Sequence, residues 1–129
     1  MRVLVCGDRD WTDEAIIHAV LDGYARQCGT RNIVVIEGDA RGADRIAGAW
    51  TTARRTTYGH DIDHECYPAN WAEHHRAAGP IRNQQMLTEG DPDIVLAFHD
   101  NLAESKGTAD MVRRARKANL PVYVIGHAT

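Results

Sequence analysis

Short apolar runs alternate with longer amphipathic segments along this chain. The runs at 3–5, 33–36 and 94–98 are continuously apolar, as expected for strands buried on both faces of a parallel sheet. A further apolar run at 122–125 predicts a last strand. The segment 62–67 alternates apolar with charged residues, which is typical of an edge strand. The pattern therefore predicts five strands.

Segments with helical spacing separate these runs. Apolar residues recur on one face between positions 16 and 24, in a helix for which Thr12 is the expected N-cap. Two more helices are expected at 43–57 and 108–118. The stretch 70–89 also has a helical pattern, and we expect it to break at Gly79-Pro80 because proline interrupts the interior of a helix.

This alternation of strands and helices predicts the fold class α/β. We expect a single doubly wound Rossmann-like domain over residues 1–129, with a mostly parallel five-stranded sheet and helices on both faces. The first strand is expected near the centre of the sheet. Right-handed crossovers would then bring the loops after the first, second and fourth strands to one edge.

Composition narrows the classes of partner. The formal net charge of −3 over 129 residues disfavours a surface that coats nucleic acid. No apolar run approaches the roughly 20 residues of a transmembrane helix, and the chain starts directly as a strand without an export signal. We therefore expect a cytoplasmic protein with no membrane partner. The three cysteines form no CxxC pair and predict reduced thiols, with Cys6 and Cys66 buried as small apolar side chains.

Turns that contain glycine follow three of the predicted strands. Such turns place backbone N–H groups and the positive end of a helix at the carboxyl edge of a sheet, where α/β folds bind phosphate-bearing ligands. The competing interpretation is structural, with tight turns, surface salt bridges and helix N-caps such as Thr108. On the ligand interpretation, the binding residues in these turns are Gly7, Arg9, Asp10, Gly38, Arg41, Gly42, Asp44, Gly107 and Thr108.

A second polar feature, the pair Arg82-Asn83, follows the Gly79-Pro80 step. A guanidinium and a carboxamide at a break in the chain can bind a phosphate, a ribose or the edge of a base. The alternative is a helix start with polar side chains that face solvent. Both residues join the candidates for ligand binding.

The histidines do not predict a metal site, and no cofactor is expected. His60 and His64 are four residues apart, but they lie at a turn and on the predicted edge strand, where this spacing does not converge. His74 and His75 are adjacent, so in a helix they point about 100° apart. No carboxylate–histidine set has the spacing of a metal centre.

Four segments together, in this order, resemble the SLOG superfamily of Rossmann-like domains. They are GDRDW at 7–11, GDARGAD at 38–44, GPIRNQQM at 79–86 and KGTADMVRRAR at 106–116. The likeness is strongest to the stand-alone YspA/cpYpsA-related branch. It is more distant to the lonely-guy phosphoribohydrolases and to the DprA/Smf DNA-processing proteins.

The resemblance implies a pocket for a nucleotide or nucleotide-derived ligand, formed by these loops. Arg82 matches an arginine of the phosphoribohydrolases, which makes it a candidate catalytic residue. Met111 stands where those enzymes carry their catalytic glutamate, and methionine cannot act as a base. Asp110 is one position away and is the second catalytic candidate. Whether the protein is an enzyme is therefore left open.

Three functions follow as hypotheses. The first is binding of a nucleotide-derived small molecule, for sensing or sequestration. The second is hydrolysis of nucleoside monophosphates by a phosphoribohydrolase-type N-glycosidase. The third is DprA-like binding of single-stranded DNA through the basic cluster of Arg113, Arg114, Arg116 and Lys117. The acidic net charge disfavours this function. A homo-oligomer is left open.

Overall fold

The structure, a computed structural model, describes residues 1–129 except 30–31, 56, 58–61 and 128–129. Five parallel strands form one sheet in the order β3-β2-β1-β4-β5, with β1 at its centre. The predicted α/β class, the parallel sheet and the edge position of the third strand are confirmed. The strands are β1 (Arg2–Gly7), β2 (Ile33–Glu37), β3 (Ile62–Cys66), β4 (Ile94–Phe98) and β5 (Val122–Ile125).

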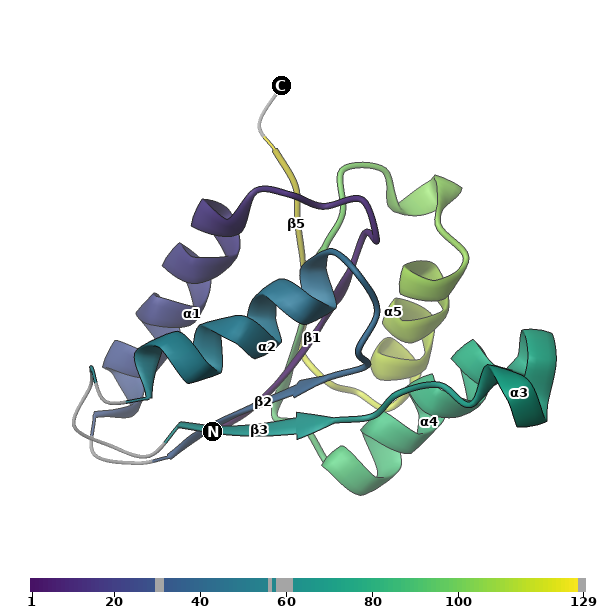
Figure 1. Ribbon diagram of the computed structural model, residues 1–129, viewed down its shortest axis with the longest axis horizontal. Helices are drawn as coiled ribbons and strands as arrows, with labels where there is room; N and C mark the ends of the chain where they lie inside the picture. The colour runs from purple at the N-terminus through teal and green to yellow at the C-terminus, as the bar shows by residue number, and fades with distance from the viewer. Residues whose placement is uncertain (30–31, 56, 58–61, 128–129) are drawn as a thin grey trace.

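Helices cover both faces of the sheet (Figure 1). One core cluster lies between the sheet and the pair α1 (Glu14–Cys28) and α2 (Ala43–Arg54). The other lies between the sheet and the pair α4 (Ala78–Gly90) and α5 (Gly107–Lys117). Alternate residues of β1 enter the two cores: Val3 and Val5 the first, Leu4 and Cys6 the second. This double burial explains the continuous apolar runs in the sequence.

The predicted break in the 70–89 stretch occurs at a different residue. A short helix, α3 (Trp71–His74), ends at His75, whose backbone φ is +52°, and a 3-10 turn, η1 (His75–Ala77), leads into α4. Gly79 and Pro80 lie within the first turn of α4. Proline is tolerated there because the first N–H groups of a helix have no partner within the helix.

Two helix boundaries also differ from expectation. Asp13, not Thr12, is the N-cap of α1, and its carboxylate accepts a hydrogen bond from Ile16 N at 3.4 Å. The second helix ends at Arg54, three residues before the predicted end. The described residues contain no helix that is both long and apolar enough to cross a bilayer.

Gly7, the last residue of β1, packs closely against neighbouring elements. A Cβ atom at this position would lie 2.4 Å from the Phe98 carbonyl oxygen and 2.8 Å from Ala43 Cβ. The next residue, Asp8, donates its N–H to the same Phe98 carbonyl at 2.9 Å. Glycine is therefore required here by close packing between β1, β4 and the start of α2.

We expect the Gly7→Ala substitution to destabilise the protein by about 2–3 kcal/mol. The added Cβ would clash with the Phe98 carbonyl oxygen and with Ala43 Cβ, and neither a backbone atom nor a core side chain can move away easily. The matched control is Gly23→Ala in the middle of α1, where an added Cβ would meet no atom within 4 Å. That control should stabilise the protein by about 0.5–1 kcal/mol through helix propensity. Urea unfolding of both variants measures the difference, and equal effects would contradict the packing argument.

Candidate ligand-binding site

A cavity of about 910 Å³ lies at the carboxyl edge of the sheet. The loops after β1, β2 and β4 line it together with α4 and the start of α5, as the crossover argument predicted. A smaller hollow of about 370 Å³ shares Arg9, Arg41, Trp71 and Arg82 with it. Every candidate residue from the sequence lines one of these spaces except Gly42.

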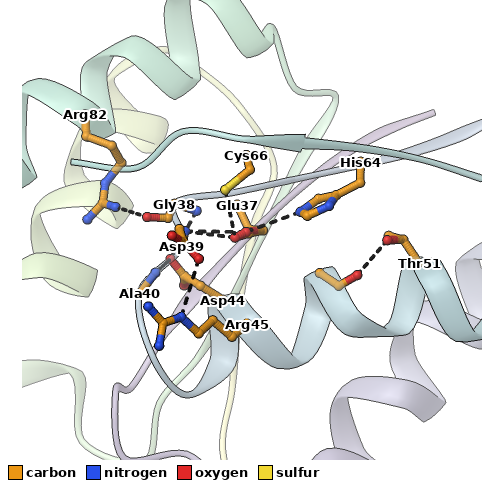
Figure 2. Close-up of polar contacts among 11 residues, drawn as sticks. Glu37, Gly38, Asp39, Ala40, Asp44, Arg45, Thr51, His64, Cys66 and Arg82 are labelled. Carbon is orange, nitrogen blue, oxygen red and sulfur yellow. Dashed lines mark hydrogen bonds and ion pairs between the residues drawn. The ribbon is translucent and has the colours of Figure 1, made fainter. Parts of the chain in front are cut away.

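Arg82 is buried, with an exposed fraction of 8%. Its Nη1 donates to the carbonyl oxygen of Gly38 in the loop after β2, and its Nε donates to Asn83 Oδ1 at 3.2 Å. Figure 2 shows the guanidinium directed at the Gly38 carbonyl. The interpretation of this pair as solvent-facing polar residues is therefore wrong. Nη2 has no hydrogen-bond partner among the described residues.

Asn83 links α4 to α5. Its Nδ2 donates to Gly107 O at 3.2 Å and to Asp110 Oδ2 at 3.0 Å. The Asp110 carboxylate also accepts hydrogen bonds from Arg114 Nε at 2.8 Å and Arg113 Nη2 at 3.4 Å. Arg82-Asn83 thus joins the loop after β2 to the start of α5, and Asp110 is engaged in two ion pairs.

Asp44 is a buried carboxyl group beneath the loop after β2. Its Oδ2 accepts hydrogen bonds from Gly38 N at 3.1 Å and Ala40 N at 3.3 Å (Figure 2). Burial, with the nearby Glu37 carboxylate, raises the pKa of Asp44 to about 7, although Arg82 and the two amides oppose the shift. Two amides that a phosphate cradle would use are therefore already hydrogen-bonded to this side chain.

The glycines at the site have different roles. Gly42 has φ +80°, and a Cβ there would lie 2.3 Å from the Asp8 carbonyl oxygen, so this glycine allows the first two loops to touch. At Gly38, a Cβ would collide with the Arg82 guanidinium. At Gly107, it would meet no atom within 4 Å. Gly107 is thus the position where the backbone is open to a ligand.

The start of α5 faces the cavity. The N-cap of α5 is Lys106, so the alternative interpretation of Thr108 as its N-cap is wrong. The Ser105 hydroxyl accepts the Thr108 N–H at 3.0 Å. Thr108 is itself buried, with 7% exposure. The Gly107 N–H has no hydrogen-bond partner among the described residues, and it lies at the positive end of the helix dipole.

The cavity carries an excess of positive charge, although the chain as a whole is acidic. Arg9 is exposed and lies over the Trp71 ring, 5.6 Å from its centroid. Arg41 and Asp10 form an exposed ion pair at 3.1 Å. Six cations line the cavity against four carboxylates: Arg9, Arg41, Arg76, Arg82, Lys106 and Arg113 against Asp8, Asp10, Asp44 and Asp110.

Comparison with known proteins places this chain in a family. The family model described as YspA, cpYpsA-related SLOG family matches residues 1–74. The chain belongs to this SLOG family. Gene 61 protein of Mycobacterium phage D29 is 38% identical to it over 126 residues, which cover 97% of this chain and 96% of that protein. Membership of the family suggests a role related to nucleotide ligands.

The sequence did not reveal every residue that lines the SLOG cavity. Trp71 and Arg76 contribute to it but stood in none of the four motifs, and Lys106 stood in the motif at 106–116 without being named as a ligand-binding candidate. Trp71 is 48% exposed. The signal available in the sequence was a tryptophan that follows Pro68 and Asn70, outside the apolar runs of the predicted strands.

A second cluster was missed completely. Glu37, His64 and Cys66 lie together between β2 and β3, although the sequence predicted no metal site. Cys66 is exposed, so its predicted burial is wrong, whereas that of Cys6 is confirmed. Desolvation, with the nearby carboxylates of Glu37 and Asp39, raises the pKa of the Cys66 thiol to about 11. His60, the other histidine considered there, lies outside the described residues.

The raised pKa of Asp44 predicts a specific pH dependence of stability. The folded state holds the Asp44 proton up to about pH 7, whereas the unfolded chain releases it near pH 4. The contribution of Asp44 to the free energy of unfolding is therefore most favourable below about pH 4. It falls as pH rises from about 4 to about 7, by up to about 1.4 kcal/mol per pH unit.

Asp44→Asn removes the titration but keeps an oxygen acceptor for the two amides. The stability of this variant relative to wild type should therefore improve steadily between about pH 4 and pH 7. Urea unfolding across this range measures the free energy of unfolding of both proteins. The contributions of the other titrating groups cancel in the difference between variant and wild type. A difference that does not change with pH would show that Asp44 titrates normally.

Proposed function

We propose that this SLOG domain binds a phosphate-bearing nucleotide or nucleotide-derived ligand in the large cavity, for sensing or sequestration. The observation that carries the proposal is the excess of cations over carboxylates in the cavity of a chain whose net charge is −3. Protonation of Asp44 would add to this excess. A polyanionic ligand matches both features.

Exposed cations would make the direct contacts with phosphate. Arg9 and Arg41 reach the cavity from two different loops, and among the described residues Arg41 is held only by an exposed ion pair with Asp10. A bidentate guanidinium contact with phosphate would compete well against such a pair. The open Gly107 amide at the start of α5 offers a further donor.

The nucleobase would have an aromatic surface available. Trp71 lines both hollows and already carries Arg9 over its ring. Stacking of a base on an aromatic ring contributes about 1–3 kcal/mol. In this arrangement Arg82 and Asn83 hold the loops in place from below, and Arg82 offers the ligand the two N–H groups of Nη2, which have no partner among the described residues.

No observation favours the other two hypotheses, which stay predictions. Met111 is fully buried in the second core cluster, and Asp110 is tied to two arginines and to Asn83. An ion-paired carboxylate is poorly suited to protonate a leaving base. For DNA binding, two members of the basic cluster, Arg113 and Arg114, are already paired with Asp110.

Nucleotide binding is tested by the melting temperature of the purified protein with a panel of nucleoside mono- and diphosphates, ADP-ribose and cyclic nucleotides. A bound ligand should raise the melting temperature, and above the dissociation constant the rise should grow with the logarithm of ligand concentration. Arg9→Ala should weaken binding about tenfold, since it removes a charge-assisted contact and the cover of Trp71. No shift with any member of the panel at millimolar concentration would contradict the proposal.

The matched control is Arg116→Ala, an exposed arginine on α5 that lines neither hollow. It should leave affinity unchanged, and an equal loss in both variants would indicate only general charge attraction. Release of free base from any bound nucleotide is measured in the same samples. Turnover would replace the binding function by the N-glycosidase hypothesis.

A further inference from the structure

Three side chains with different metal-binding atoms converge beside the second strand. Glu37 ends β2, and His64 and Cys66 are two residues apart on β3, so they share one face of that strand. Strand register places Cys66 opposite Glu37 and His64 opposite Val35. Figure 2 shows both side chains directed toward the Glu37 carboxylate.

The spacing of the three donor atoms fits one tetrahedral ion. His64 Nε2 lies 3.4 Å from Glu37 Oε2, and Cys66 Sγ lies 3.6 Å from Glu37 Oε1. All three ligand atoms lie within 4.8 Å of one another. Zinc bonds of about 2.0–2.3 Å at tetrahedral angles separate neighbouring ligand atoms by about 3.3–3.6 Å. Only small side-chain adjustments would therefore close the site around an ion.

The surroundings orient these donors and leave them room. The Asp39 N–H donates to Glu37 Oε1 at 2.8 Å, which fixes the carboxylate as outer hydrogen bonds do in metal sites. Gly48 on α2 makes space for the imidazole, since a Cβ there would lie 3.1 Å from His64 Cε1 and Nε2. Glu37 is 1% exposed, whereas His64 and Cys66 are exposed and leave a path from solvent.

We propose that Glu37, His64 and Cys66 bind one zinc ion, with a fourth position open to water. Thiolate and imidazole donors favour zinc over magnesium and calcium, which prefer oxygen ligands alone. On binding, the Cys66 thiol releases its proton to solvent, and His64 offers the lone pair of Nε2. None of the three residues lines the nucleotide cavity, so this site is independent of the proposed function.

Cobalt(II) tests the donor set directly. Chelator-treated protein, kept reduced with a phosphine, is titrated with Co²⁺ and then with Zn²⁺ against a chromophoric chelator. We expect one equivalent to bind, with the intense visible bands of tetrahedral cobalt and a thiolate-to-cobalt charge-transfer band in the near ultraviolet. Zn²⁺ should abolish both. A weak octahedral spectrum, or the absence of the charge-transfer band, would overturn the proposal.

Two variants test whether His64 and Cys66 are the residues that bind the ion. Cys66→Ser should lose the charge-transfer band, and both it and His64→Ala should bind Zn²⁺ at least tenfold more weakly. Both side chains are exposed on an edge strand, and circular dichroism verifies that the variants fold. Unchanged affinity in either variant would refute the assignment.

His127→Ala is the matched control, because His127 lies between the carboxylates of Asp13 and Asp100, at 3.0 and 2.9 Å. It should retain full Zn²⁺ affinity. Loss of binding in this variant instead would place the ion at His127 and overturn the proposal. Nucleotide binding measured in chelator separates failure of this site from failure of the cavity.

Discussion

The contact between the Arg82 guanidinium and the Gly38 carbonyl holds the carboxyl edge of the sheet together. Arg82 belongs to α4, and Gly38 is the first residue after β2, so one buried side chain fixes a loop to a helix that follows it by more than 40 residues. Asn83 extends the connection to the start of α5. Loss of this guanidinium would leave a buried carbonyl without a partner and Asp44 without its nearest compensating charge.

The same region explains how an acidic chain presents a basic cavity. Glu37 and Asp44 are buried and accept hydrogen bonds from backbone amides of their own loop. Their charge is directed inward, toward the protein. Arg9 and Arg41 project from the loop ends into the cavity. Net charge alone therefore does not describe what a ligand meets, since the field in a cleft depends on which groups face it.

The strands were predictable because burial on both faces leaves continuous apolar runs, as in Val3–Val5 of the central strand. Of their order, only the central place of the first strand and the edge place of the third were predicted. The residues of the cavity were also largely predictable, since the carboxyl ends of parallel strands meet at one edge. The partners of these residues were not. The Gly38–Asp44 loop has the composition of a phosphate cradle, yet its amides bind Asp44. The sequence shows which hydrogen-bond donors and acceptors lie in the same loop, but it does not show which of them bond to each other.

The sequence by itself determined the α/β class, the family and the set of loops that form the cavity, because periodicity and local motifs carry this information. Only the tertiary structure decided that Arg82 is buried and links α4 to the loop after β2, that burial raises the pKa of Asp44 to about 7, and that Glu37 meets His64 and Cys66. These features depend on strand register and on burial. Both arise from contacts between segments far apart in the chain, and no local pattern records them.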